Sequence, residues 1–119
     1  MLDEIGKMID LDLSTIDAIA VAAGPGSFTG LRIGSATAKG LGLALDTPLL
    51  AVPTVDALAY NLYGTDKLVC PIMDAQRSQV YTGVYAFDDR TLTVLTPQMT
   101  ISVEELPVLL TRTGRGVLF

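Results

Sequence analysis

Hydrophobic and polar positions change their spacing along the chain, and each spacing predicts a different element. Helical spacing of apolar residues predicts an amphipathic helix over about residues 2–11. Residues 18–23 and 49–52 are short, unbroken apolar runs, which are typical of strands buried on both faces of a parallel sheet. Segments 31–45 and 55–63 return to helical spacing. The first half therefore alternates helices with strands, which predicts a parallel α/β layer.

The second half favours an antiparallel meander. Residues 67–74 form an apolar run, residues 79–87 alternate, and residues 91–95 predict a third strand. The alternation places Val80, Thr82, Val84 and Ala86 on one face, with Tyr81, Gly83, Tyr85 and Phe87 on the other. A helix over 103–110, capped by Ser102, is expected to close this half. Pro107 argues against that helix, since proline beyond the first turn costs about 3 kcal/mol.

Composition and charge exclude several classes of protein. Half of the 119 residues are apolar and 18% are charged, so the chain is too hydrophobic to be disordered. Its apolar runs stop well short of the roughly 20 residues that cross a membrane. The formal net charge is −5, which makes the chain a poor stand-alone binder of nucleic acid, because phosphate neutralisation supplies most of that affinity.

Two residue counts narrow the chemistry further. The single cysteine, Cys70, excludes an internal disulfide and fits a reducing, cytoplasmic location. Histidine is absent, which removes the commonest general base and metal ligand. A chain this short and hydrophobic is expected to be a buried piece of something larger or to have a partner.

A glycine-rich loop follows the first predicted strand and opens the 31–45 helix, with Ser27 or Thr29 available as its cap. Its characteristic residues are Gly24, Pro25, Gly26, Ser27, Phe28, Thr29, Gly30 and Arg32. A helix N-terminus with free N–H groups can hold phosphate, so one interpretation is a nucleotide loop. The other is a structural turn, because the P-loop lysine is absent, Pro25 has no N–H and Phe28 would crowd a phosphate.

The helix after this loop carries a stripe of small residues. The stripe consists of Gly30, Gly34, Ala38 and Gly42, and a narrow polar strip consists of Arg32, Ser35, Lys39 and Asp46. Glycine inside a helix costs about 1 kcal/mol relative to alanine, so close packing is expected to compensate. The surface packed on this stripe is either the protein's own sheet or another subunit.

Asp74 and Arg77 stand in the turn between two predicted strands. They either face a ligand cleft or hold the turn as an ion pair. Tyr81 and Tyr85 are interpreted as packing residues and Cys70 as a small buried apolar group.

Three stretches of the sequence resemble the TsaB (YeaZ) family of bacterial tRNA-modification proteins. The first runs from Asp17 to Gly34 and contains GPGSFTGLRIG, and the last runs from Asp74 to Tyr81 and reads DAQRSQVY. Val-Pro-Thr at 52–54 matches a further family segment between them. The family often has arginine where Ala23 stands and a second arginine where Gln76 stands.

The resemblance implies an α/β fold of the actin-like, sugar-kinase-like ATPase type, related to ribonuclease H. It covers nearly the whole chain, yet the family is about twice as long on the usual scale of one domain per 150 residues. We therefore expect the middle of that fold. Residues 1–65 would be the C-terminal part of its first subdomain, and residues 66–119 the N-terminal part of its second.

For function, the resemblance implies a non-catalytic scaffold subunit. Family members pair with TsaD, which transfers threonylcarbamoyl to adenosine 37 of tRNA, and work with a TsaE-like ATPase. ATP and metal are then expected on the partner subunit, tRNA is contacted only indirectly, and no membrane is involved. A homodimer would cover the same surface when the partner is absent.

The family's dimer surface uses its first helix and the helix after the glycine loop. Mapped onto this chain, the expected partner interface is Leu2, Ile5, Ile9, Gly30, Leu31, Ile33, Gly34, Ala38, Leu41 and Gly42. Two alternatives stay open: a small-molecule kinase or ATPase of the same fold with Asp74 as base, and a glycoprotease-like homodimer of unknown activity.

Overall fold

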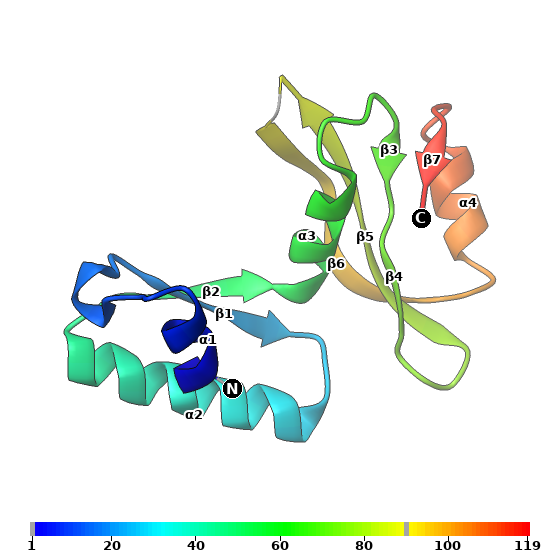
Figure 1. Ribbon diagram of the computed structural model, residues 1–119. Helices are drawn as coiled ribbons and strands as arrows, with labels where there is room; N and C mark the ends of the chain where they lie inside the picture. Colours follow the sequence, from blue (N-terminus) through cyan, green and yellow to red (C-terminus); the bar gives the residue numbers. More distant parts are fainter. Residues whose placement is uncertain (1, 90) are drawn as a thin grey trace. The chain divides into compact units, whose positions relative to one another are not determined.

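Residues 2–89 and 91–119 are described in the computed structural model, and they fall into two units. The N-terminal unit is Met1–Val52 and the C-terminal unit is Pro53–Phe119 (Figure 1). The sequence-based boundary after residue 65 differs from this division by a short helical segment, whose packing is described below.

The N-terminal unit is a helix–strand alternation, as predicted. Its elements are helix α1 (Leu2–Met8), the 3₁₀ helix η1 (Leu13–Thr15), strand β1 (Ile19–Gly24), helix α2 (Phe28–Leu45) and strand β2 (Leu49–Pro53). Strands β1 and β2 form a two-stranded sheet and run in the same direction, with α2 as the crossover between them (Figure 1). This is the right connection for parallel strands, because a tight hairpin cannot join them.

The predicted burial of these strands is wrong. Within β1 only Gly24 is buried, and in β2 the side chains of Leu49, Leu50 and Ala51 are exposed. The apolar runs reflect a sheet built to be covered on both faces, whereas the described residues cover these strands only in part. In the described part of this unit, the buried residues are Gly24, Ala38 and Gly42.

The C-terminal unit is a meander with helices. Its elements are helix α3 (Thr54–Ala59), the 3₁₀ helix η2 (Tyr60–Leu62), strands β3 (Leu68–Val69), β4 (Ile72–Asp74), β5 (Gln79–Asp88) and β6 (Thr91–Ser102), helix α4 (Leu106–Thr111) and strand β7 (Val117–Leu118). Strand β5 lies centrally and pairs antiparallel with β3, β4 and β6, while β7 pairs parallel with β3.

Two of the predicted strands differ from the structure, and a proline lies in each of the two segments concerned. The strand expected over 67–74 is interrupted at Pro71, which has no N–H to donate, although β3 and β4 both pair with β5. The strand expected over 91–95 continues to Ser102 through Pro97. The register of β5 against β6 shifts around Gly83, so an irregularity in the ladder accommodates the proline.

The alternation of β5 is confirmed by its packing. Tyr85 lies in a buried cluster with Val55 and Ala59 of α3 and Val69 of β3. The other face holds Val80, Val84 and Ala86, in clusters that include Leu106 of α4. Both faces of β5 are therefore covered by helices, which explains why six of its residues are buried.

The structure corrects two expectations, one about the unit to which α3 belongs and one about the effect of Pro107 on α4. Helix α3 lies in the C-terminal unit because Val55 and Ala59 pack on Tyr85, so residues 53–65 belong with the second half of the chain. Pro107 falls in the first turn of α4, where its missing N–H costs nothing, so it does not disrupt the helix. Ser102 Oγ accepts a 3.2 Å hydrogen bond from the Glu105 N–H just before that turn.

Candidate functional site

The glycine loop is held against the helix that it opens. Ser27 caps α2, with its hydroxyl accepting a 3.4 Å bond from the Gly30 N–H. Gly24 is buried with φ of +102°, and a Cβ there would stand 3.3 Å from Leu31 Cδ1. Gly26 also faces Leu31, at 3.6 Å. Glycine at these positions thus permits close packing of Leu31, which favours the structural-turn interpretation of the loop.

The small-residue stripe of α2 divides into two parts. Gly42 packs on its own sheet, where a Cβ would come within 3.0 Å of the Leu49 side chain, and Ala38 is likewise buried. A Cβ at Gly34 would meet nothing within 4 Å, and Gly30 is exposed. A spacing of four residues turns about 40° further round a helix at each step, so the stripe cannot face one surface along its whole length.

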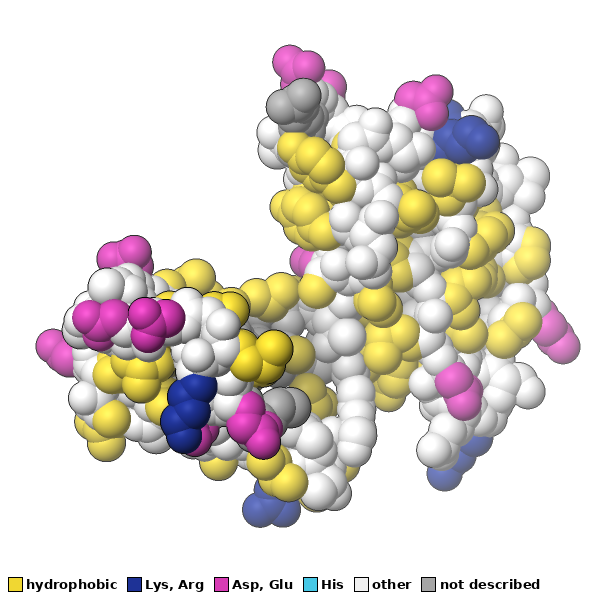
Figure 2. Space-filling view, in the orientation of Figure 1, with side chains coloured by type: hydrophobic (Ala, Val, Ile, Leu, Met, Phe, Trp, Pro, Cys, Tyr) yellow, Lys and Arg dark blue, Asp and Glu magenta, His cyan; other side chains and the backbone are white. Residues whose placement is uncertain are grey.

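Large apolar side chains on α1, on the turn after α1 and on α2 are open to solvent. Ile5 and Ile9 are 47% and 64% exposed, Ile33 is 63% exposed, and Leu43 is 88% exposed. Figure 2 shows hydrophobic atoms at the surface of this unit, between acidic and basic side chains. Isolated apolar residues on a surface are ordinary, but a contiguous set marks an interaction site.

A groove of about 610 Å³ lies between α1 and the C-terminal half of α2. Its apolar lining comes from Ile5, Leu11, Leu13, Ile16, Ile19, Leu41 and Leu45. Asp3, Lys7 and Asp10 also line it, and the Lys7 ammonium donates to the Asp3 carboxylate at 2.8 Å. The two helices named by the resemblance therefore enclose an open apolar groove.

Nine of the ten expected interface residues fall into three groups. Ile5, Ile9, Gly30, Ile33, Gly34 and Leu41 are exposed or half-buried on α1, α2 and the turn after α1; Ala38 and Gly42 are buried within the unit; and Leu31 packs on the loop. The side chain of Leu2 lies outside what the structure describes. Ala38 and Gly42 thus match the alternative in which the stripe packs on its own sheet.

Asp74 and Arg77 are brought into one tight turn, but not as an ion pair. The Asp74 carboxylate accepts a 2.7 Å bond from the Gln76 N–H, and the structure gives Arg77 no acidic partner among the described residues. Gln76, Arg77 and Ser78 all have positive φ, between 52° and 63°. The turn is therefore held by a hydrogen bond between the Asp74 side chain and the backbone, which corrects the ion-pair interpretation.

Shifted pKa values in the C-terminal unit have structural causes. Burial raises the pKa of the Cys70 thiol, whose sulfur lies 3.2 Å from the Thr82 hydroxyl. Burial also raises the pKa of Tyr85, whose hydroxyl donates a 2.7 Å hydrogen bond to Asp56. Both groups lie among packed side chains, so neither is arranged as a nucleophile or base.

Metal-ligating side chains are dispersed in the part of the chain that the structure describes. Across 2–89 and 91–119, no three His, Cys, Asp or Glu side chains gather closely enough to hold a metal ion. Within the same residues, no helix has the length and hydrophobicity that crossing a membrane requires.

Comparison with known proteins identifies the family. The family model described as "TsaD: tRNA N6-adenosine threonylcarbamoyltransferase" matches residues 1–115, so the chain belongs to this family of α/β proteins. Within it, the resemblance to TsaB (YeaZ) is confirmed by curated relatives. TsaB of Bacillus subtilis is 40% identical over 110 residues, and TsaB of Escherichia coli is 35% identical over 92 residues. These matches cover 92% and 75% of this chain, and 48% and 39% of the relatives.

Solved structures confirm the fold class. YeaZ from Pseudomonas aeruginosa superimposes with a TM-score of 0.76 at 32% identity, covering 86% of this chain and 50% of that one. A second structure, described as an uncharacterized protein with similarity to peptidase YEAZ from the same organism, gives 0.73 at 31% identity and covers 86% of this chain and 48% of its own. The chain thus spans about half the length of the relatives that it matches.

Proposed function

We propose that this protein is a non-catalytic scaffold subunit in the synthesis of threonylcarbamoyladenosine on tRNA, and that it pairs with a TsaD-like transferase. The curated relatives named TsaB are described as tRNA threonylcarbamoyladenosine biosynthesis proteins, which supports the pathway. ATP and metal are assigned to the partner, a TsaE-like ATPase completes the assembly, and tRNA contacts this chain only indirectly.

The exposed apolar surface of α1 and α2 is the observation that carries the pairing role. Two residues of the expected interface, Ile9 in the turn after α1 and Ile33 of α2, are each more than half exposed in a unit with few buried residues. Covering apolar surface contributes about 25 cal/mol per Å², so a partner helix laid on this surface gains affinity from the same side chains. The sequence itself supplies no histidine ligand for catalytic metal chemistry.

Co-purification with a TsaD-like partner tests the proposal. Ile33→Glu places a charge on the expected interface and should abolish co-elution on a sizing column. Leu43→Glu is the matched control, because it makes the same kind of exchange on the same helix outside the expected interface, and it should leave co-elution intact. Both side chains are largely exposed, so neither exchange should unfold the chain.

Gly34→Leu gives a second test with no change of charge. Gly34 has free space around it, so leucine fits the isolated chain but blocks the close approach of another helix. Retention of the complex by both Ile33→Glu and Gly34→Leu would contradict the proposal. Ala38→Arg is unsuitable as a test, because Ala38 is buried within its own unit.

A further inference from the structure

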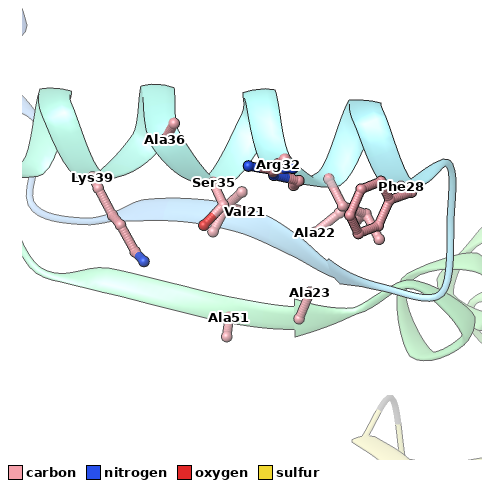
Figure 3. Close-up of a pocket in the computed structure, with 10 residues that line it drawn as sticks. Val21, Ala22, Ala23, Phe28, Arg32, Ser35, Ala36, Lys39 and Ala51 are labelled. Carbon is pink, nitrogen blue, oxygen red and sulfur yellow. The ribbon is translucent and has the colours of Figure 1, made fainter.

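A second pocket lies along a different face of α2 from the apolar groove. It has a volume of about 650 Å³ and lies between α2 and the strands β1 and β2. Its lining combines small apolar residues of the strands, among them Ala22, Ala23 and Ala51, with three members of the polar strip of α2. These three are Arg32, Ser35 and Lys39. Figure 3 shows Ser35 and Lys39 extending from α2 on the side of the strands, with Phe28 at the first turn of the helix.

Two positively charged side chains line the pocket, although the N-terminal unit is acidic overall. Residues 2–52 contain three cations, Lys7, Arg32 and Lys39, and six acidic side chains. Lys7 is bonded to Asp3, whereas the structure shows no acidic partner among the described residues for Arg32 or Lys39. Both of these cations line the pocket, and no acidic residue is among its described lining residues.

Geometry makes the two cations suitable for one extended anion. Arg32, Ser35 and Lys39 are separated by three and four residues, so they share one face of α2. Seven residues of helix rise about 10 Å, which separates the two charges along the axis while the serine hydroxyl lies between them. The Arg32 guanidinium is also held over the Phe28 ring, 5.3 Å from its centroid, which reduces the freedom lost on binding.

We infer that this pocket binds a linear polyphosphate, with Arg32 and Lys39 each contacting phosphate oxygens and Ser35 donating a hydrogen bond between them. A linear polyphosphate carries closely spaced charges on a narrow chain, which suits two cations above a floor of alanines. The same phosphate chemistry is found in free nucleoside polyphosphates and along an RNA backbone. The pocket reaches the first turn of α2 at Phe28 and Leu31, whereas the three polar side chains lie further along the helix than the Ser27 cap.

Titration of the chain alone with sodium tripolyphosphate tests the inference. Calorimetry at low ionic strength should show saturable binding with a Kd below about 1 mM, weakening as salt is added. Arg32→Gln and Lys39→Gln should each weaken binding about tenfold, Ser35→Ala about threefold, and the double cation variant should abolish it. Lys7→Gln removes the same charge from the same unit and should bind as the unchanged chain does.

Competition then separates the two sources of phosphate. Competition with tripolyphosphate by ADP, but not by AMP, would identify a nucleoside polyphosphate as the ligand. Competition by a short single-stranded RNA would identify an RNA backbone as the ligand. Absence of saturable tripolyphosphate binding, or equal binding by the double variant with unchanged circular dichroism, would overturn the inference. The measurement needs no transferase, so its result does not depend on pairing with one, although competition by RNA would contradict the proposal that tRNA contacts this chain only indirectly.

Discussion

The two units of this protein differ in how much of their apolar surface they bury. In the C-terminal unit, helices cover both faces of β5, and Val55, Ala59, Cys70 and Tyr85 are fully buried. In the N-terminal unit, the described residues bury only Gly24, Ala38 and Gly42, and large apolar side chains stay exposed. The C-terminal unit therefore contains its own core, whereas the N-terminal unit presents a surface with the composition of a core.

This difference indicates where each unit gains its stability. Burial of apolar surface is the largest favourable contribution to folding, so substitutions should cost most where side chains are enclosed. Exposed positions of the N-terminal unit should tolerate the same substitutions in the isolated chain and respond only when something covers them. Matched exchanges in the two units test this contrast directly.

The chain offers a separate probe for each unit. All four tyrosines lie between residues 60 and 85 and there is no tryptophan, so tyrosine fluorescence reports only on the C-terminal unit. The 18-residue helix α2 is the longest among the described residues, so circular dichroism at 222 nm follows largely the N-terminal unit.

The largest effect is expected from removing a buried aromatic ring. Tyr85→Ala should lower the free energy of unfolding of the C-terminal unit by about 3–5 kcal/mol, because it leaves a cavity and removes a partner of Asp56. Phe28→Ala, at a ring that is 74% exposed, should change stability by less than about 1 kcal/mol. Urea unfolding followed by both probes measures the pair, and similar losses would contradict the contrast.

Two glycines should respond with opposite signs. A Cβ at Gly83 would stand within 2.8 Å of Tyr85 ring carbons, so Gly83→Ala should destabilise the C-terminal unit by about 1–3 kcal/mol. Gly34 is helical with open space around it, so Gly34→Ala should stabilise α2 by up to about 1 kcal/mol. Thermal unfolding by circular dichroism and fluorescence would show the opposite shifts in midpoint.

A smaller effect should come from the Tyr85 hydroxyl alone. Tyr85→Phe should cost about 1–2 kcal/mol at neutral pH, since Asp56 loses a hydrogen bond in a half-buried site. Urea unfolding followed by tyrosine fluorescence measures this loss, and a cost as large as that of Tyr85→Ala would contradict it.

The same hydroxyl makes stability depend on alkaline pH. The folded pKa of Tyr85 is raised above its ordinary value near 10, so above that pH the unfolded chain loses a proton that the folded chain keeps. Stability should therefore fall as pH rises past about 10, and less so in Tyr85→Phe. Cys70, whose pKa is also raised, contributes a fall that begins at lower pH and remains in the variant. Identical pH profiles would contradict this assignment.

The smallest effect is expected at the ion pair of α1. Lys7 and Asp3 are 75% and 79% exposed, so Lys7→Ala should change stability by no more than about 0.5 kcal/mol. Circular dichroism during urea unfolding gives the measurement. A loss above about 1 kcal/mol would show that α1 depends on this pair rather than on its apolar face.

Much of the local structure was predictable because it depends on local spacing. Helical spacing located α1 and α2, Ser27 was one of two expected caps, and the alternation in β5 assigned its two faces correctly. The loop motif of residues 24–34 also carried enough information to indicate the family.

The site was less predictable. The stripe on α2 could be read from the sequence. The sequence did not show that Ala38 and Gly42 are buried within the unit while Gly34 has open space around it. The polar strip could also be read from the sequence. That Arg32 and Lys39 line one pocket depends on the strands packed beside the helix, which only the structure reveals. Asp74 and Arg77 are neighbours in a turn, but the hydrogen bond to the Gln76 N–H depends on a left-handed backbone that no side-chain pattern encodes.

The sequence by itself determined which segments are helix and strand, the absence of histidine, and the family. Spacing and capping act over a few residues, so they can be read from one chain. Only the tertiary structure decided that α3 joins the second unit, that Pro107 is harmless in the first turn of α4, and that the strands of the first unit lie exposed. Burial depends on what lies opposite each face, and that is fixed by contacts between segments distant in the chain.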